Sequence, residues 1–196
     1  VAGTDLIIPD GALSVGLSTN ERSTFAIKAP TSTLRTPTYS IDGMAFEAAG
    51  TAEQYDVTFA QGQIEMLNQA AGAFPIPVLP LSGTAVFAED QFTGTAQTSL
   101  PRAPDTPIDV DFRFKDGQGD ADIRVESLRF RPGGLQPQDL VPTLRGKIAS
   151  VDGSVNADLA VIFGADMTPR GTGTFDIVNM ALGTAPGPIT GLSGTV

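Results

Sequence analysis

Residues 155–163 read VNADLAVIF, and this stretch indicates the fold class of the chain. Its apolar side chains occupy every second position: Val155, Ala157, Leu159, Val161 and Phe163. Because successive side chains of a β-strand point to opposite faces, the pattern predicts a strand with one apolar and one polar face. Beyond Asp158 the second face also turns apolar, at Ala160 and Ile162, so we expect this end of the strand to be covered on both sides.

The clearest alternating segment is residues 108–115, IDVDFRFK. One face would carry four apolar residues, Ile108, Val110, Phe112 and Phe114, and the other four charged residues, Asp109, Asp111, Arg113 and Lys115. An Asp-Gly turn signal follows at Asp116, and residues 121–130 resume the alternation, which together predict an antiparallel hairpin. We expect the charged set to face solvent and the apolar set to face inward.

The alternation slips by one residue in two later segments. In residues 121–130 the slip falls at Ser127, and in residues 175–182 it falls near Asn179. A slip of one residue turns the buried face over. A β-bulge, or a strand that crosses between two packed sides, would produce it. We interpret both segments as long strands that bend through the structure.

A unit of strand, Pro/Gly-rich elbow and strand recurs along the chain. Strands that open on glycine start near Gly62, Gly119 and Gly173, which are 57 (119 − 62) and 54 (173 − 119) residues apart. Recurrence at a nearly fixed period is typical of repeat architectures. We therefore interpret residues 1–196 as a single elongated β segment with repeat units at these positions, and as a fragment of a longer protein.

Composition limits the classes of function. The 196 residues carry a net charge of −10 and contain no Cys and no His. A Ser-His-Asp or Cys-His mechanism cannot be built from such a chain, and nucleic acid is not an expected partner. The alternating segments predict a mainly β fold of about a dozen strands. One short helix is expected at residues 137–145, where Pro142 limits its length.

Two groups of carboxylates have ordinary explanations. DGQGDAD at residues 116–122 resembles an acidic Ca²⁺ loop, but it lacks the spacing and the terminal Glu of an EF-hand, and a hairpin turn explains it. Asp109 and Asp111 would be neighbours on the wet face of a strand, where solvated charges are found. No G-x-S-x-G nucleophile motif is present. We therefore expect no enzyme, no catalytic residue, no metal site and no cofactor.

The remaining constellation is the apolar stripe along the strands. Its members are Ile108, Val110, Phe112, Phe114, Ile123, Val125, Val155, Leu159, Val161, Phe163, Phe175 and Ile177. Such a stripe fits the closed core of a β-sandwich, and it equally fits an open groove that holds a lipid chain. Both need a continuous dry face, so the pattern alone does not separate them.

Residues 128–196, about a third of the chain, resemble the C-terminal region of YdbH-like proteins of the AsmA-like group, which includes TamB. The resemblance rests on LRFRPGGLQPQDLVPTLRGKI from Leu128, VDGSVNADLAVIFG from Val151 and GTGTFDIVNMALGTAPGPITGLSGTV from Gly171. The strings L-x-P-x-D-L-x-P at residues 135–142 and G-P-[IV]-x-G-L-S-G-T at residues 187–195 are its most specific parts.

The resemblance implies a periplasmic part of a protein anchored in the inner membrane, with the anchor outside this fragment. It implies a curled β-sheet whose open apolar groove passes phospholipid between the inner and outer membranes. Expected partners are phospholipid acyl chains, flanking repeats of the same polypeptide and an outer-membrane lipoprotein. The alternatives are a structural β-sandwich or adhesin-like module, and an accessory domain for dicarboxylate transport. A dicarboxylate site needs Arg or Lys in a pocket, and the predicted apolar faces carry neither.

Overall fold

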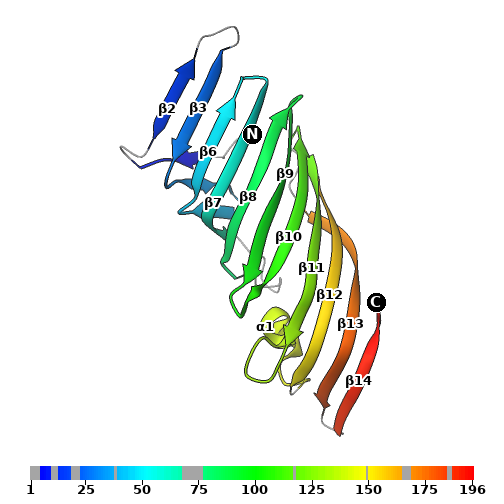
Figure 1. Ribbon diagram of the computed structural model, residues 1–196. Helices are drawn as coiled ribbons and strands as arrows, with labels where there is room; N and C mark the ends of the chain where they lie inside the picture. Colours follow the sequence, from blue (N-terminus) through cyan, green and yellow to red (C-terminus); the bar gives the residue numbers. More distant parts are fainter. Residues whose placement is uncertain are drawn as a thin grey trace.

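The computed structural model describes residues 5–9, 13–18, 23–37, 39–67, 77–116, 118–148, 150–164, 169–184 and 187–196. Within these ranges the chain forms one antiparallel sheet of 14 strands that does not close on itself (Figure 1). The same ranges contain one α-helix, α1 (Pro137–Leu140), and one 3-10 turn, η1 (Pro142–Leu144). The expected fold class is confirmed. The predicted helix is divided into α1 and η1, and η1 begins at Pro142.

From β7 onward the strands pair in the order of the chain. Their bounds are β7 Gln54–Met66, β8 Leu79–Ala88, β9 Gln91–Leu100, β10 Ala103–Lys115, β11 Gln118–Phe130, β12 Val151–Phe163, β13 Pro169–Thr184 and β14 Gly187–Thr195. Each pairs antiparallel with the next, so connections alternate between the two ends of the strands. The predicted hairpin is β10–β11, with Phe112 opposite Ala121.

The N-terminal strands form two branches that meet at β7. Their bounds are β1 Asp5–Ile7, β2 Ser14–Ser18, β3 Thr24–Ala29, β4 Thr33–Arg35, β5 Tyr39–Asp42 and β6 Ala45–Gly50. The first half of β7 pairs with β6, which continues to β3 and β2, and the second half pairs with β5, which continues to β4 and β1. The change falls at Gln61, whose φ of 61° lies in the left-handed region.

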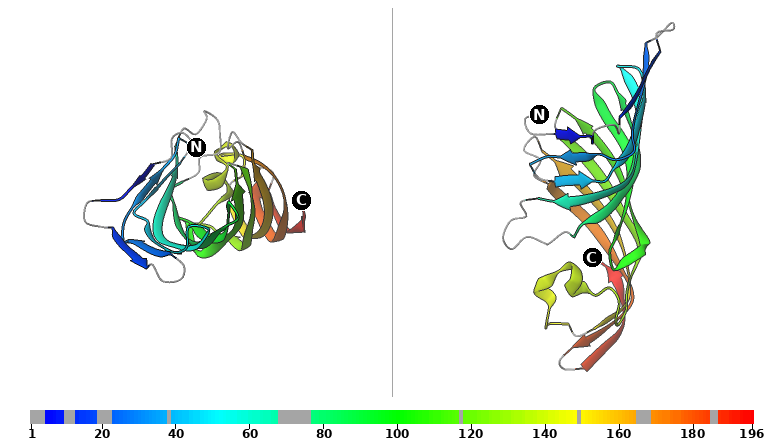
Figure 2. Two further views of the ribbon diagram at one scale, coloured as in Figure 1. Left: turned by 90° about the horizontal axis from the view of Figure 1, so that it is seen from above. Right: turned by 90° about the vertical axis from the view of Figure 1, so that its left-hand side faces the viewer.

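The sheet curls into an open arc, and α1 lies on the concave side (Figure 2). The accessible surface is 12363 Å². A compact protein of 20.3 kDa would expose about 8,800 Å². The excess reflects a single sheet without a second sheet packed on it in the described residues. Five of the twelve buried hydrophobic residues are alanines: Ala29, Ala48, Ala85, Ala121 and Ala157.

Register places the predicted apolar residues in rows across neighbouring strands. Val110 of β10 lies opposite Ile123 of β11, and Ile123 lies opposite Leu159 of β12. The charged residues of β10 lie on the other face and are exposed, while Val110, Phe112 and Phe114 are half-buried, so the predicted orientation of this strand is confirmed. Two ion pairs cross that polar face, Arg113 with Asp120 at 3.1 Å and Arg124 with Asp111 at 2.9 Å.

Bulges explain the two slips in the alternation. Ser127 in β11 and Asn179 in β13 have φ values of 52° and 48°, and the register shifts at each. On the two sides of the first bulge, Val125 lies opposite Ala157 and Leu128 lies opposite Val155. Val155 and Ala157 share a face of β12, so the extra residue keeps the apolar side chains on one face. The interpretation as long, bent strands is confirmed.

Each bulge amide is satisfied by a side chain of the adjacent strand. The Ser127 amide donates to Asn156 Oδ1 at 2.8 Å, and the Asn179 amide donates to Ser193 Oγ at 3.1 Å. Both bonds lie on the exposed polar face, so each replaces a bond to water and adds modestly to the stability of its bulge. The alternation in the sequence reveals each bulge, and the two hydrogen bonds show which side chains pair with the bulge amides.

One prediction for β12 is wrong. We expected its far end to be covered on both sides, but Ala160 is exposed and Ile162 is 64% exposed. No described element packs on the polar face there, and Ile162 has Asp120 and Arg170 as its cross-strand partners. The strand is also longer than expected, since it starts at Val151 rather than Val155.

The glycines at the predicted repeat starts lie in the first strands of three hairpins. Gly62 is in β7, Gly119 in β11 and Gly173 in β13. Their surroundings differ, because Gly62 directly follows a bulge whereas the other two precede one. Parts of two elbows, residues 68–76 and 185–186, lie outside the described residues. The repeat itself stays a prediction.

Glycines on the apolar face lie beneath large side chains of the next strand. A Cβ at Gly94 would stand 2.3 Å from the Thr84 carbonyl oxygen and 2.8 Å from Phe112 Cζ. A Cβ at Gly173 would stand 2.4 Å from Leu159 Cδ2. The apolar face therefore has room for its large residues because glycine lies next to them.

We predict that Gly94→Ala lowers the free energy of unfolding by about 1–3 kcal/mol, because the added methyl group overlaps a backbone oxygen. The matched control is Gly194→Ala in β14, where a Cβ would meet no atom within 4 Å. Urea unfolding followed by circular dichroism measures both. Equal midpoints for the two variants would contradict the crowding described here.

Candidate functional site: an apolar trough

All twelve predicted lining residues lie on one face of the sheet. The partner rows that unite them are Ile108–Val125, Val110–Ile123–Leu159, Phe112–Ala121–Val161, Phe114–Gly119–Phe163, Ala157–Phe175 and Val155–Ile177. Most are half-buried, and Phe175 is 43% exposed. Phe112, Leu159 and Phe175 are neighbours across one open sheet and do not meet across a closed core.

This apolar face is the concave one. Residues 131–148, which contain α1, lie on the concave side (Figure 2), and the buried cluster that includes Leu135 packs against Leu128, Val155 and Ile177. Those three share the face of the predicted lining residues. We call the concave apolar face the trough, and residues 131–148 the lid.

The trough also extends over strands that precede β10, where the sequence analysis assigned no lining residue. A row of aromatic side chains marks this extension: Phe25, Tyr55, Phe87, Phe92, Phe114 and Phe163. Ring centroids of Tyr55 and Phe87 are 4.9 Å apart, and those of Phe114 and Phe163 are 5.6 Å apart. The same alternation that marked the later strands carries the signal for these residues.

The lid covers one end of the trough, and its Leu135 belongs to a cluster of buried apolar residues in the described structure. Leu135 is 3% exposed and Val151 is 0% exposed, and both pack with Phe130 and Met180. Leu140 and Ile148 of the lid lie against this cluster. At this end of the trough, residues of the lid therefore cover the apolar face. Elsewhere along the trough the same face stays open.

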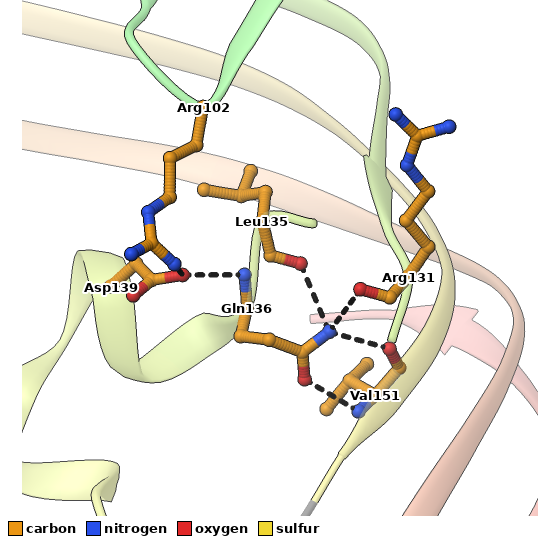
Figure 3. A network of polar contacts seen from close by, with 6 residues as sticks. All are labelled: Arg102, Arg131, Leu135, Gln136, Asp139 and Val151. Carbon is orange, nitrogen blue, oxygen red and sulfur yellow. Dashed lines mark hydrogen bonds and ion pairs between the residues drawn. The ribbon is translucent and has the colours of Figure 1, made fainter. Parts of the chain in front are cut away.

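Gln136 fastens the lid to the start of β12 (Figure 3). Its Nε2 donates to the Val151 carbonyl at 2.9 Å, and its Oε1 accepts from the Val151 amide at 2.8 Å. The same Nε2 lies 2.7 Å from the Arg131 carbonyl oxygen. The buried side chain therefore pairs with Val151 as a strand backbone would.

Asp139 connects the lid to the turn between β9 and β10. Its Oδ2 accepts from the Gln136 amide at 2.9 Å and from Arg102 Nη1 at 3.0 Å (Figure 3). The L-x-P-x-D-L-x-P string noted in the sequence thus supplies a buried leucine, the start of the helix, and a carboxylate that fixes its first turn.

We predict that Gln136→Leu lowers the free energy of unfolding by about 2–4 kcal/mol, because the amide and carbonyl of Val151 lose their buried partner. The control is Gln138→Leu, since Gln138 Oε1 is buried without a hydrogen-bond partner among the described residues. Removing an unpaired oxygen should leave the urea midpoint unchanged or raise it. A larger loss at Gln138 than at Gln136 would contradict the proposed attachment of the lid.

The residues considered for chemistry lie on the polar face or in turns. Gln97 Nε2 donates to Asp109 at 2.9 Å, and Arg124 holds Asp111. In the described ranges no three acidic side chains gather as a metal site. Burial raises the pKa of Tyr39 and of Tyr55 above the ordinary value of 10.0, so both hydroxyls keep their proton at neutral pH.

Two shallow hollows of about 400 Å³ lie mainly on the polar face rather than in the trough. The first is lined by uncharged residues, among them Gln61, Ser82 and Pro107. The second contains Asp109 and Asp111 beside Arg124, which is already paired with Asp111. Neither offers the free pair of cations that a dicarboxylate would require.

The helical elements are too short to bear on membrane insertion. No helix in the described part of the chain has the length and apolar character needed to cross a bilayer.

Comparison of the chain with protein-family models, with curated proteins and with solved structures found no match. The trough and its lid are thus the features of this chain that point toward a function.

Proposed function

We propose that this chain is a non-enzymatic lipid-binding segment, and that its trough holds the acyl chains of phospholipid. The observation that carries the proposal is the apolar face that continues in register from β3 to β13. Of the twelve lining residues, only Val125 is buried, and the others keep part of their surface exposed. Soluble monomers rarely expose contiguous apolar patches larger than a few hundred Å², and larger ones commonly mark binding surfaces.

Apolar burial alone would supply the affinity. Each acyl methylene moved from water into the trough contributes about 0.8 kcal/mol. None of the twelve predicted lining residues is charged, so a chain of methylenes would meet no desolvated charge. A phospholipid could therefore be held by its tails while its head group stays in water, which suits a carrier that must later release it.

Two other functions have less support. A structural sandwich needs a second sheet packed about 10 Å from the first, and the described strands belong to one sheet. A dicarboxylate-binding domain needs cations that point into a pocket, and neither the trough nor the two hollows provides them.

The cellular setting of the proposal follows the resemblance to YdbH-like proteins. We infer a periplasmic segment of an inner-membrane protein that moves phospholipid between the two membranes, with an outer-membrane lipoprotein as a partner. The outer edges of β2 and β14 pair with no other described strand, so flanking repeats could extend the sheet at either side.

We predict that Phe112→Asp or Leu159→Asp abolishes co-purification of phospholipid, because each places a charge in the middle of the trough. Native mass spectrometry of the purified protein detects bound lipid directly. The matched control is Asp109→Asn on the polar face of β10, which should leave the lipid signal unchanged.

Circular dichroism and urea unfolding distinguish loss of binding from loss of fold in these variants. Wild-type protein that carries no phospholipid, or a folded Phe112→Asp variant that retains it, would refute the proposed function. Equal loss of lipid in Asp109→Asn would show that binding does not depend on which face of the sheet is changed.

A further inference from the structure

The two ends of the strands differ in charge. Because neighbouring strands are antiparallel, the tight turns at residues 51–53, at residues 89–90 and after Lys115 lie at one end. The β9–β10 turn at Arg102 and the lid lie at the other end. We call these the turn end and the lid end. The aromatic row of the trough lies at the turn end, since Tyr55, Phe87, Phe92 and Phe114 directly flank those turns.

The turn end is acidic. Its described turn residues include Glu53, Glu89, Asp90 and Asp116, and all four are exposed. Lys115 and Arg170 also lie there, and Lys115 Nζ donates to the Glu89 carbonyl oxygen at 3.1 Å. An anionic group placed at this end would be repelled by the surrounding carboxylates.

The lid is basic although the chain as a whole has a net charge of −10, and two exposed carboxylates, Asp105 and Asp152, also lie at the lid end. The lid contains three exposed cations, Arg131, Arg145 and Lys147, and its single acidic residue is Asp139. Asp139 is already paired with Arg102 at 3.0 Å. None of the three cations forms an ion pair with a residue in the described part of the chain.

The lid is amphipathic: one side is apolar and the other carries exposed cations, as a lipid with an apolar tail and a charged head group would require. Leu135, Leu140 and Ile148 face the covered end of the trough, whereas Arg145 and Lys147 are exposed to solvent. Gln136 and Asp139 attach this segment to the sheet, so its cations lie at the lid end of the trough. An apolar face with a cationic segment at one end suits an acyl chain that ends at a phosphate.

We propose that the lid, through the positive charges of Arg131, Arg145 and Lys147, attracts the phosphate of an amphiphile whose acyl chain lies in the trough. This inference rests on the proposed function and adds an orientation to it: the head group lies at the lid end, and the tail points toward the aromatic row. Arginine suits this role because its planar guanidinium can donate two parallel hydrogen bonds to phosphate oxygens. The carboxylates of the turn end disfavour the reverse orientation.

Two probes with the same tail test the proposal, dodecyl phosphate and dodecyl maltoside, each used below its critical micelle concentration. The variant carries Arg131→Gln, Arg145→Gln and Lys147→Gln together. Exposed ion pairs contribute little singly, so we expect the three changes together to weaken dodecyl phosphate binding about tenfold. Dodecyl maltoside binding should be unchanged. Isothermal titration calorimetry measures both.

The matched control is Arg113→Gln, Arg124→Gln and Arg170→Gln, which changes net charge equally but on the polar face. It should shift dodecyl phosphate binding by less than about twofold, since exposed charges more than about 10 Å apart are screened at 0.1 M salt. The tenfold difference of the lid variant should also shrink at 1 M salt.

The outcomes separate the two proposals. If both probes bind and the lid variant keeps full affinity for dodecyl phosphate, the head-group inference fails and the trough remains. An equal loss of both probes, or an equal loss in the polar-face control, also overturns the inference. If neither probe binds the wild-type protein, the proposed function fails and the inference fails with it.

Discussion

The antiparallel hydrogen-bond register of a single sheet is the constraint on which the rest of this structure depends. It brings Val110, Ile123 and Leu159 into one row and places their charged neighbours on the other face. The bulges at Ser127 and Asn179 preserve that arrangement along strands of 13 and 16 residues. Without the extra residues, the apolar side chains beyond each bulge would turn to the polar face, and the trough would end there.

Stability and binding place opposite demands on the concave face. A closed core would stabilise the chain further, but it would leave no open apolar surface. The structure divides the face between the two uses. The lid forms a well-packed cluster around Val151 and Leu135, and the remainder stays half-buried. The glycines beneath Phe112 and Leu159 allow large side chains to lie close to the sheet, so curvature does not require a second layer.

Period-two alternation was sufficient to predict the β class, the orientation of β10, the β10–β11 hairpin and the shared face of the twelve lining residues. Pro137 and Pro142 were sufficient for the short helix. Alternation could not show what covers a face, because that depends on contacts distant in sequence. Ile162 was therefore wrongly expected to be covered. The attachment of the lid through Gln136 was also missed, because a glutamine that pairs with a strand backbone has no sequence period. Tyr55 and Phe87 carried the right alternation but needed the register of β7 and β8 to join the trough.

Site-specific photo-cross-linking is the most direct test of the claim that the concave face holds acyl chains. A photoreactive amino acid would replace Val110, which faces the trough, or Asp111, its neighbour on the polar face of the same strand. After irradiation of protein with bound phospholipid, mass spectrometry reports covalent lipid adducts. The account predicts adducts at position 110 and none at position 111. Adducts at both positions in equal yield, or at position 111 alone, would contradict it.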